Sequence, residues 1–423
     1  MCPPTPRIVW ILIAVGTAAR LMVAHWTQGL ELILDEVNYL DYGTHLLAHG
    51  KLPGAFRPPA YPALVALAQV IGGAGPTSVW VVQSVISMGA AFTLFHWLQS
   101  HVGRVGAVLS TALWCLHPVL IGFTHLLWTE TLFLSLLIFF LATAMPSGTM
   151  SIRRTAAAGV LYGVAALTRS VLTPFVWLAP LFVAVLPSTW AFRQRPWFRA
   201  MVFWAAFGLT LAPWVAHNQQ VEGRPIFTET TNGYNLWKGN TDWKHPFATE
   251  APQYPGPLVS IPMFPYEGSG PRLSDHCEAL HQGDETFTRW HLSQCARSMA
   301  LDHMVADPMG ILSRGVSKLG HAFHPSNLLT RHYWLGIYKG FPPVLAPMLI
   351  WATALSSLGI LLLGVLGLRR APRTPLPLLL AGLGASQLAV IFITFGNTRF
   401  RLPVILMAII IAGWIPSKTT DPD

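Results

Sequence analysis

Two adjacent carboxylates, Asp35 and Glu36, stand near the start of a polar stretch that follows the first apolar segment and runs from Leu34 to Pro62. A positioned carboxylate can accept the proton of a hydroxyl group, a step that contributes roughly 10²–10⁴ in rate. A third acid, Glu130, precedes another apolar run. Because ionisable residues at membrane depth are costly and tend to be functional, these acids are candidate catalytic residues.

Arginines at the ends of several other apolar runs could bind an anion. They are Arg57, Arg169, Arg399 and Arg401. A guanidinium group binds phosphate through two parallel hydrogen bonds and stabilises it as a leaving group. Acids and arginines at one membrane depth would suit a sugar attached to a lipid phosphate. A phosphate with a second pKa of about 6 leaves readily, so no strong general acid is required.

Each of these residues also has a structural interpretation. Asp35 and Glu36 could cap the first helix or solvate a loop, and Glu130 could stabilise a helix N-terminus. The arginines could anchor the chain to lipid headgroups or extend to the interface without binding a ligand. Arg20 lies inside the first apolar run, and we expect it to extend toward the interface.

The composition is that of a polytopic membrane protein. Hydrophobic residues make up 52% of the 423 residues and charged residues 11%, with a mean hydropathy of +0.47. A soluble domain carries roughly 25% charged residues. The lysines and arginines behind the formal charge of +9 are scattered between apolar runs, so we expect a lipid bilayer and no nucleic acid as partner. The predicted fold class is an all-α membrane bundle.

A bilayer core requires about 20 apolar residues per helix, and on this basis we expect ten spans, several of which extend into flanking residues. The expected spans are Ile8–Trp26, Val79–Leu98, Ala107–Phe123, Leu132–Met145, Ala156–Leu167, Leu172–Leu186, Met201–His217, Val344–Leu368, Leu376–Phe395 and Leu402–Ile415. The apolar run Ala60–Ile71 would cover only about 18 Å of a hydrocarbon core of about 30 Å, so we expect a helix lying along the surface.

The distribution of charge predicts which side each loop faces. When Ala60–Ile71 does not span, the acids separate by side: the cytoplasmic side has only Asp421 and Asp423, and the opposite side collects all the others. The cations on the cytoplasmic side are Arg7, Arg104, Arg153, Arg154, Arg193, Arg195, Arg199, Arg369, Arg370, Arg373 and Lys418. The positive-inside rule then makes both termini cytoplasmic and turns Asp35, Glu130 and the long polar segment outward. The chain contains no Asn-x-Ser/Thr sequon, which favours a bacterial source, and the expected location is the inner membrane.

Three regions are expected along the chain. Residues 1–217 would form an N-terminal transmembrane bundle with a catalytic first outer loop, residues 218–342 an extracytoplasmic region, and residues 343–423 the C-terminal transmembrane helices. Within the middle region, the Pro-, Gly- and Asn-rich first half predicts ordered loop. Its second half predicts helices over Asp284–Val305 and over Met309–Phe323, the latter amphipathic.

The cysteines of the middle region allow two interpretations. Cys277 and Cys295 could form a disulfide if this region faces an oxidising compartment. Together with the nearby histidines they could instead bind zinc, although their spacing matches no known finger. The histidines are His276, His281 and His291. We expect no required cofactor or metal at the site, with a divalent metal left open.

Beyond single residues, the order of several motifs resembles the GT-C glycosyltransferases. The similarity is closest to the family-39 and lipopolysaccharide-type transferases, which include protein O-mannosyltransferases and the lipid A aminoarabinose transferase. The motifs are Asp35-Glu36, Tyr39, Arg57–Pro62, His125–Glu130, Gly159–Gly163 with Leu167-Thr168-Arg169, Asn232–Trp237 with Gly239-Asn240, Asp307-Pro308 with Lys318, and Arg399–Pro403. They extend over nearly the whole chain, and their order is more specific than any one motif.

The resemblance implies a fold and an activity. The fold would be a GT-C-like bundle of about ten transmembrane helices with extracytoplasmic juxtamembrane helices and one long outer loop region. The activity would be inverting transfer of a sugar from a polyprenyl-phosphate donor to an acceptor hydroxyl outside the membrane. Unlike the larger members, this chain shows no sizeable C-terminal soluble domain, which leaves acceptor recognition to residues 218–342.

The resemblance also implies residue roles. Asp35 would be the base on the acceptor, Glu36 would orient sugar or acceptor, and Glu130 would be a second acid. The four arginines named above would bind the donor phosphate. The remaining substrate-binding candidates are Tyr61, Asn235 and Asn240. Which sugar is moved, and whether the acceptor is a lipid, a glycan or a protein, stay open.

Two other classes of function compete with an enzyme. A transporter or flippase of lipid-linked sugars would also require charged residues in a membrane bundle, but transporters place them near the bilayer midplane. A non-catalytic membrane scaffold would tolerate the loss of Asp35, Glu130 and Arg399 together.

Overall fold

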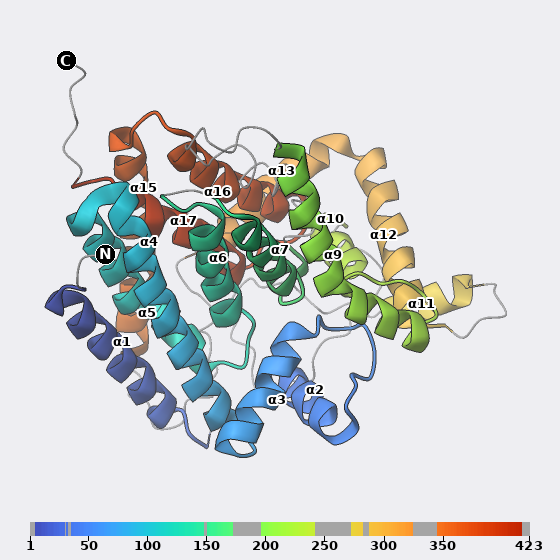
Figure 1. Cartoon of the computed structure of the whole chain (residues 1–423). Helices are drawn as coiled ribbons and strands as arrows, with labels where there is room; N and C mark the ends of the chain where they lie inside the picture. The colour runs from blue at the N-terminus through green and yellow to red at the C-terminus, as the bar shows by residue number, and fades with distance from the viewer. Residues whose placement is uncertain are drawn as a thin grey trace.

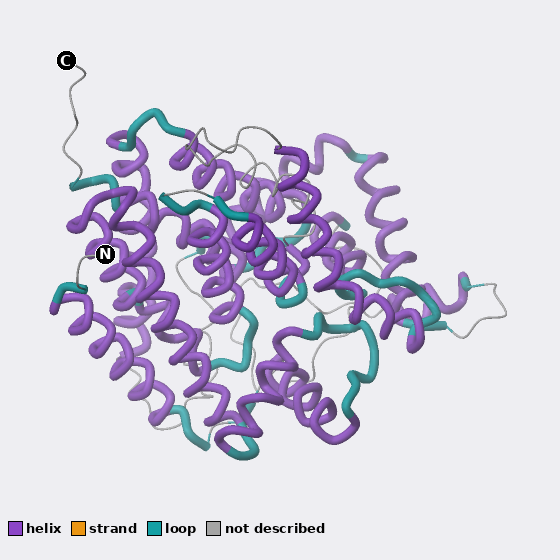
Figure 2. The backbone as a smooth tube through the Cα atoms, in the orientation of Figure 1, coloured by secondary structure: helices purple, strands orange, loops and turns teal. Residues whose placement is uncertain are grey.

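The structure is a computed structural model that describes residues 5–29, 31–32, 35–147, 150–171, 196–241, 272–281, 287–324 and 345–416. Within these ranges the chain forms helices and connecting segments and no β-strand (Figures 1 and 2). The predicted all-α class is therefore confirmed for the described residues.

Five described helices are long and apolar enough to cross a bilayer. They are α1 (Arg7–Trp26), α4 (Pro76–Leu116), α9 (Pro196–Val221), α15 (Leu345–Arg370) and α16 (Pro375–Ile393). A sixth crossing results if α5 (Pro118–Gly122) and α6 (Glu130–Ala144), which meet at 119°, count as one broken span. By length and composition, the described residues thus contain fewer spans than the ten expected.

Several expected spans differ from the helices of the structure. The run Ala156–Leu167 becomes α7 (Ile152–Ala166), and the run after Arg401 becomes α17 (Leu402–Ala412). With 15 and 11 residues, both fall short of the roughly 20 that a crossing requires. The expected span Leu172–Leu186 lies outside the described residues.

Helix α4 combines most of two expected spans, Val79–Leu98 and Ala107–Phe123. It has 41 residues, and Gly103 interrupts its helical geometry with φ 75° and ψ 171°. Only glycine adopts such a positive φ without steric cost, so this residue allows the chain to break between two helical segments. The second segment ends at Leu116, which is followed by α5 and the short helix η1 (Phe123–His125).

The polar stretch after α1 forms α2 (Asp35–His49), and the apolar run after it forms α3 (Ala60–Gly72). With 13 residues, α3 is too short to span. The two helices pack against each other, and the rings of Tyr39 and Tyr61 meet edge to face at 4.8 Å. That α3 lies along a membrane surface stays a prediction.

Two glycines of the Gly159–Gly163 motif bring α7 close to α9. A Cβ atom at Gly159 would lie 2.4 Å from the carbonyl oxygen of Phe203, and one at Gly163 would lie 2.8 Å from Thr210 Cβ. Small residues at such crossings let helix backbones approach closely, the usual packing of membrane helices. This packing supports the C-terminal end of α7, which carries Arg169.

Arg20 does not extend to the interface, so that prediction is wrong. Its side chain is fully buried between α1 and α4 and donates to the carbonyl oxygens of Gly16 at 3.0 Å and Cys115 at 2.9 Å. The carbonyls near a helix C-terminus carry partial negative charge and lack intrahelical donors. The hydrogen bond from Arg20 to Cys115 therefore connects α1 to the C-terminal end of α4.

The middle region contains more helix than expected. Residues Asn232–Asn240, expected as loop, form helix α10, because the buried Trp237 packs against α12 (Arg289–Ala306). This burial overrides the local preference of asparagine and glycine for turns. The two predicted helices are present as α12 and α13 (Pro308–Ala322), although α12 begins five residues later than expected.

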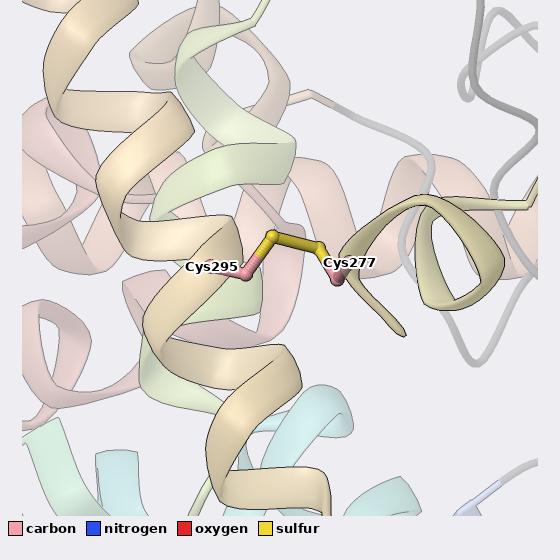
Figure 3. The surroundings of a disulfide bond; sticks show 2 residues. All are labelled: Cys277 and Cys295. Atoms are coloured by element: carbon pink, nitrogen blue, oxygen red, sulfur yellow. A yellow bond between two sulfur atoms is a disulfide. The ribbon is translucent and has the colours of Figure 1, made fainter. Parts of the chain in front are cut away.

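A disulfide between Cys277 and Cys295 joins α11 (Leu273–Leu280) to α12, with Cα atoms 5.9 Å apart (Figure 3). Because both thiols are consumed, neither can be a zinc ligand. Among the described residues, no three His, Cys, Asp or Glu side chains gather where they could hold a metal ion. Disulfides persist in oxidising compartments, which agrees with the outward orientation expected for this region.

The disulfide allows a test of sidedness. In intact spheroplasts treated with a membrane-impermeant phosphine, we expect Cys277 and Cys295 to react with an impermeant PEG-maleimide, because their region faces outward. Cys115 is buried and Cys2 is expected on the cytoplasmic side, so neither should react. The measurement is the gel shift of the protein. A shift that appears only after the membrane is permeabilised would reverse the orientation.

Candidate active site

Asp35, in the first turn of α2, is held between two arginines from distant parts of the chain. Arg57 Nη2 pairs with its Oδ1 atom, and Arg399 Nη1 donates to its Oδ2 atom at 2.8 Å. Arg57 lies just before α3, whereas Arg399 lies in the short helix η4 (Thr398–Arg401) between α16 and α17. Both oxygens of the carboxylate are thus occupied by guanidinium groups.

Glu130, in the first turn of α6, makes the second contact of this kind. Arg169 Nη1 pairs with Glu130 Oε1 and also donates to Thr129 Oγ1 at 3.1 Å. Arg399 Nε lies 3.8 Å from the same carboxylate oxygen, so Arg399 bridges the two acids. We call Asp35, Arg57, Glu130, Arg169 and Arg399 the ion-pair cluster.

The ion-pair cluster has three guanidinium groups for two carboxylates. Among these five residues one positive charge is in excess, and the charge of Glu229 also acts on Arg57. The two acids occupy helix N-terminal turns, where the helix dipole favours negative charge. A helix N-terminus and an excess cation together favour a ligand such as phosphate.

Aromatic rings surround the arginines of the cluster. The Arg57 guanidinium carbon lies 5.1 Å from the ring centre of Tyr39, and that of Arg399 lies 5.3 Å from the ring of Trp128. Such cation–π contacts hold a guanidinium group in place. The other rings beside these arginines and Arg169 are Phe56, Phe133 and Phe400.

The surroundings of Asp35 decide its protonation. Burial alone would raise the pKa of its carboxyl group, but the charges and hydrogen bonds of Arg57 and Arg399 outweigh burial and hold the pKa well below its usual range. A carboxylate with a lowered pKa is a weak base. Asp35 can therefore take a proton from a hydroxyl group only after at least one arginine has moved to another anion.

A cavity of about 10 Å³ adjoins the cluster, room for about one water molecule. It lies between α6, α16 and the η4–α17 junction. Polar lining residues are Glu130, Arg169, Gln387 and Arg399. Glu130, Arg169 and Arg399 thus line this cavity, whereas Asp35 and Arg57 do not.

Glu36 and Tyr61 lie beside the cluster but outside it. Glu36 is 4% exposed, and its Oε1 atom accepts a hydrogen bond from the backbone N–H of Leu127 at 3.0 Å. The Tyr61 hydroxyl donates to Gln83 Oε1 at 3.1 Å. These contacts connect α2 and α3 to α4 and to the segment before α6, so both residues support the position of the cluster. Their contact with a substrate stays a prediction.

Arg401 is separated from Arg399 by one residue, yet it makes different contacts. It is 2% exposed, and its Nη1 atom donates to the carbonyl oxygens of Ala322 at 3.3 Å and His324 at 2.9 Å, at the end of α13. The structure does not bring Arg401 into the ion-pair cluster. It connects η4 to α13 in the same way that Arg20 connects α1 to α4.

The predicted site residues of α10 lie at another contact. Asn240 is fully buried, donates to the Ile393 carbonyl at 2.7 Å, and accepts a hydrogen bond from Lys318 Nζ at 3.0 Å. It therefore joins α10, α13 and α16. Asn235 is partly buried on α10, with its backbone N–H bonded to the Thr231 carbonyl. Neither asparagine makes a hydrogen bond to the ion-pair cluster among the contacts of the described residues.

Sequence reasoning missed two residues near the cluster. Gln387 lines the cavity from α16, and the only signal in the sequence was a polar residue within an apolar run. Glu229 accepts hydrogen bonds from Ser170, the neighbour of Arg169, and from Thr231 Oγ1 at 2.6 Å. Its position in a loop far from the other acids gave no signal.

Comparisons with known proteins find similar chains among the solved structures. No family model and no curated protein matches the chain. Two of these similar structures are ArnT from Cupriavidus metallidurans bound to undecaprenyl phosphate and the same protein in the apo state, each 12% identical, with TM-scores of 0.42 and 0.41. Each match covers 96% of this chain and 77% of the other. Likeness at this level does not establish a shared activity, so function must be inferred from the site.

The pairing of Asp35 predicts how stability depends on pH. The pKa of Asp35 is lower in the folded state than in the unfolded chain. As pH falls below about 4, Asp35 therefore binds a proton in the unfolded chain before it does so in the folded protein. The stability contributed by its contacts with the two arginines is lost over this pH range. Arg399→Gln removes one of the two cations, so the folded-state pKa should rise. We expect this variant to be less stable at pH 7 and to lose less stability between pH 5 and 3.

Unfolding of the purified protein in detergent, followed by tryptophan fluorescence against pH, measures this difference. Arg289→Gln is the control, because Arg289 lies outside the ion-pair cluster, over the ring of Phe56. If the free energy of unfolding falls equally between pH 5 and 3 in the wild type and in Arg399→Gln, Arg399 does not lower the pKa of Asp35.

Proposed function

We propose that this protein is a membrane glycosyltransferase that moves a sugar from a polyprenyl-phosphate donor to an acceptor hydroxyl. The observation that supports it is Asp35 held between Arg57 and Arg399, with Glu130 beside them. The transfer requires a base for the hydroxyl proton and cations for the departing phosphate. The ion-pair cluster contains both, and an apolar helical bundle surrounds it.

The donor phosphate would compete with Asp35 for its arginines. In the structure each oxygen of Asp35 accepts a hydrogen bond from an arginine, which makes the carboxylate a weak base. A phosphate that binds Arg57 and Arg399 would release the carboxylate and remove the charges that lower its pKa. Donor binding would therefore both place the leaving group and activate the base.

The reaction would then be a single displacement. The acceptor oxygen attacks the anomeric carbon as its proton passes to Asp35, and the bond from that carbon to the phosphate oxygen breaks. The electron pair of that bond leaves with the polyprenyl phosphate, which the arginines hold. Attack opposite the leaving group inverts the anomeric configuration. Glu130 would keep Arg169 and Arg399 in position during the step.

The setting of the site supports an enzyme over a transporter of lipid-linked sugars. Every member of the ion-pair cluster lies at or beside a helix end: Asp35 and Glu130 in first turns, Arg57 before α3, Arg169 after α7, and Arg399 between α16 and α17. Transporters place such groups near the bilayer midplane. Glu130, at the break between η1 and α6, is the one member on an interrupted span. We propose that the site faces the outside of a bacterial inner membrane, the orientation that the charge distribution and the disulfide favour.

The decisive variant is Asp35→Asn. We expect transfer to fall by about 10²–10⁴, the contribution of a general base. We also expect the purified variant to bind sugar-free polyprenyl phosphate more tightly than the wild type, because the arginines no longer have a competing carboxylate. Mass spectrometry of envelope glycans in a complemented deletion strain measures transfer, and thermophoresis in detergent measures binding.

Asp41→Asn is the matched control, because Asp41 is exposed on the same helix. It should leave both transfer and lipid binding unchanged. Wild-type transfer by Asp35→Asn would exclude Asp35 as the base. Unchanged or weaker binding of the sugar-free lipid would exclude competition between the carboxylate and the phosphate.

A further inference from the structure

Gln387 is a buried polar residue inside an apolar helix. It lies in α16, one of the helices able to cross a membrane, and is 5% exposed. A polar group buried at such a place is unfavourable unless it is hydrogen-bonded, and within transmembrane segments such groups often mark functional sites. Among the described residues, Gln387 makes no hydrogen bond with a member of the ion-pair cluster.

The amide of Gln387 makes no hydrogen bond with another described residue. Gln83, buried in α4, shows the opposite case: its amide accepts from the Tyr61 hydroxyl at 3.1 Å and donates to the carbonyls of Thr124 at 3.1 Å and Leu126 at 2.9 Å. Gln83 therefore has a structural role that accounts for its presence. Gln387 has none, and its amide remains available to a ligand.

The cavity beside the ion-pair cluster is where that ligand would bind. Gln387 lines it from α16 and Arg399 from η4, and Phe133 and Phe400 are among the other lining residues. An amide offers a donor and an acceptor together, which matches the hydroxyl groups of a sugar. A phosphate dianion accepts hydrogen bonds but donates none, so it would leave the amide oxygen unused, and a polyprenyl chain would require neither donor nor acceptor. Aromatic rings suit the apolar faces of a sugar ring.

We propose that Gln387 binds the hydroxyl groups of the sugar on the donor lipid, an inference that rests on the proposed function. The sugar would lie between Gln387 and the phosphate bound by the arginines. At about 10 Å³ the cavity is too small for a sugar ring, so it must widen. Arg399 lines the cavity and bridges both acids, and its movement toward the phosphate would open this space.

The test compares lipids with and without a sugar on the purified full-length protein. The probes are polyprenyl phosphate alone and the same lipid carrying a hexose or a pentose. In Gln387→Leu, we expect the affinity for whichever sugar-bearing lipid the wild type prefers to fall about tenfold, as two neutral hydrogen bonds are lost. The affinity for the sugar-free lipid should stay within about twofold of the wild type, since the arginines are unchanged.

Gln83→Leu is the control for structural effects. It should lower the melting temperature in detergent, because three buried hydrogen bonds are lost. Gln387→Leu should melt at the wild-type temperature or higher, because it removes an amide without a protein partner. An equal loss of affinity for sugar-bearing and sugar-free lipids would overturn the assignment, as would a lowered melting temperature with unchanged affinities.

The assignment and the proposed function can fail separately. If the wild type transfers sugar and Gln387→Leu binds the donor as well as the wild type does, only the role of Gln387 is wrong. If the wild type neither distinguishes the sugar-bearing lipids from the sugar-free lipid nor transfers sugar, the glycosyltransferase proposal fails and the role of Gln387 fails with it.

Discussion

The contact on which the site depends is the bridge that Arg399 makes between Asp35 and Glu130. Arg399 and Asp35 are 364 residues apart in the chain, yet Arg399 Nη1 lies 2.8 Å from one carboxylate and its Nε 3.8 Å from the other. Burying one of these charges alone would be strongly unfavourable, so each requires the others in place. The N-terminal ends of α2 and α6 must therefore lie beside η4. This requirement constrains how the helices that carry these ends pack.

Three other buried cations are bound by backbone carbonyls near helix ends instead of by acids. Arg20, Lys318 and Arg401 donate to carbonyl oxygens at or near the C-terminal ends of α4, α16 and α13 respectively. Those carbonyls carry the negative end of the helix dipole and lack their own donors. These three cations donate their hydrogen bonds to backbone carbonyls and do not pair with Asp35 or Glu130. The two acids pair only with the arginines of the ion-pair cluster among the described residues.

In this structure the charged groups of the site are paired with one another. Asp35 has both oxygens paired, and the adjoining cavity holds about one water molecule. A carboxylate paired with two arginines is a weak base. An incoming anion that takes the arginines would both free the carboxylate and open the space, so substrate binding and activation of the base would be one event.

The sequence by itself determined the class of the protein and the residues available for chemistry. In a chain with 11% charged residues, acids and arginines beside apolar runs stand out, and Asp35, Glu130 and Arg399 could be selected on that ground. Only the tertiary structure decided which charges meet. It joined Arg399 to the acids, directed Arg401 to α13, and placed Gln387 in the lining of the cavity. The reason is that sequence locates a residue along its helix, whereas packing between distant helices sets the direction of its side chain.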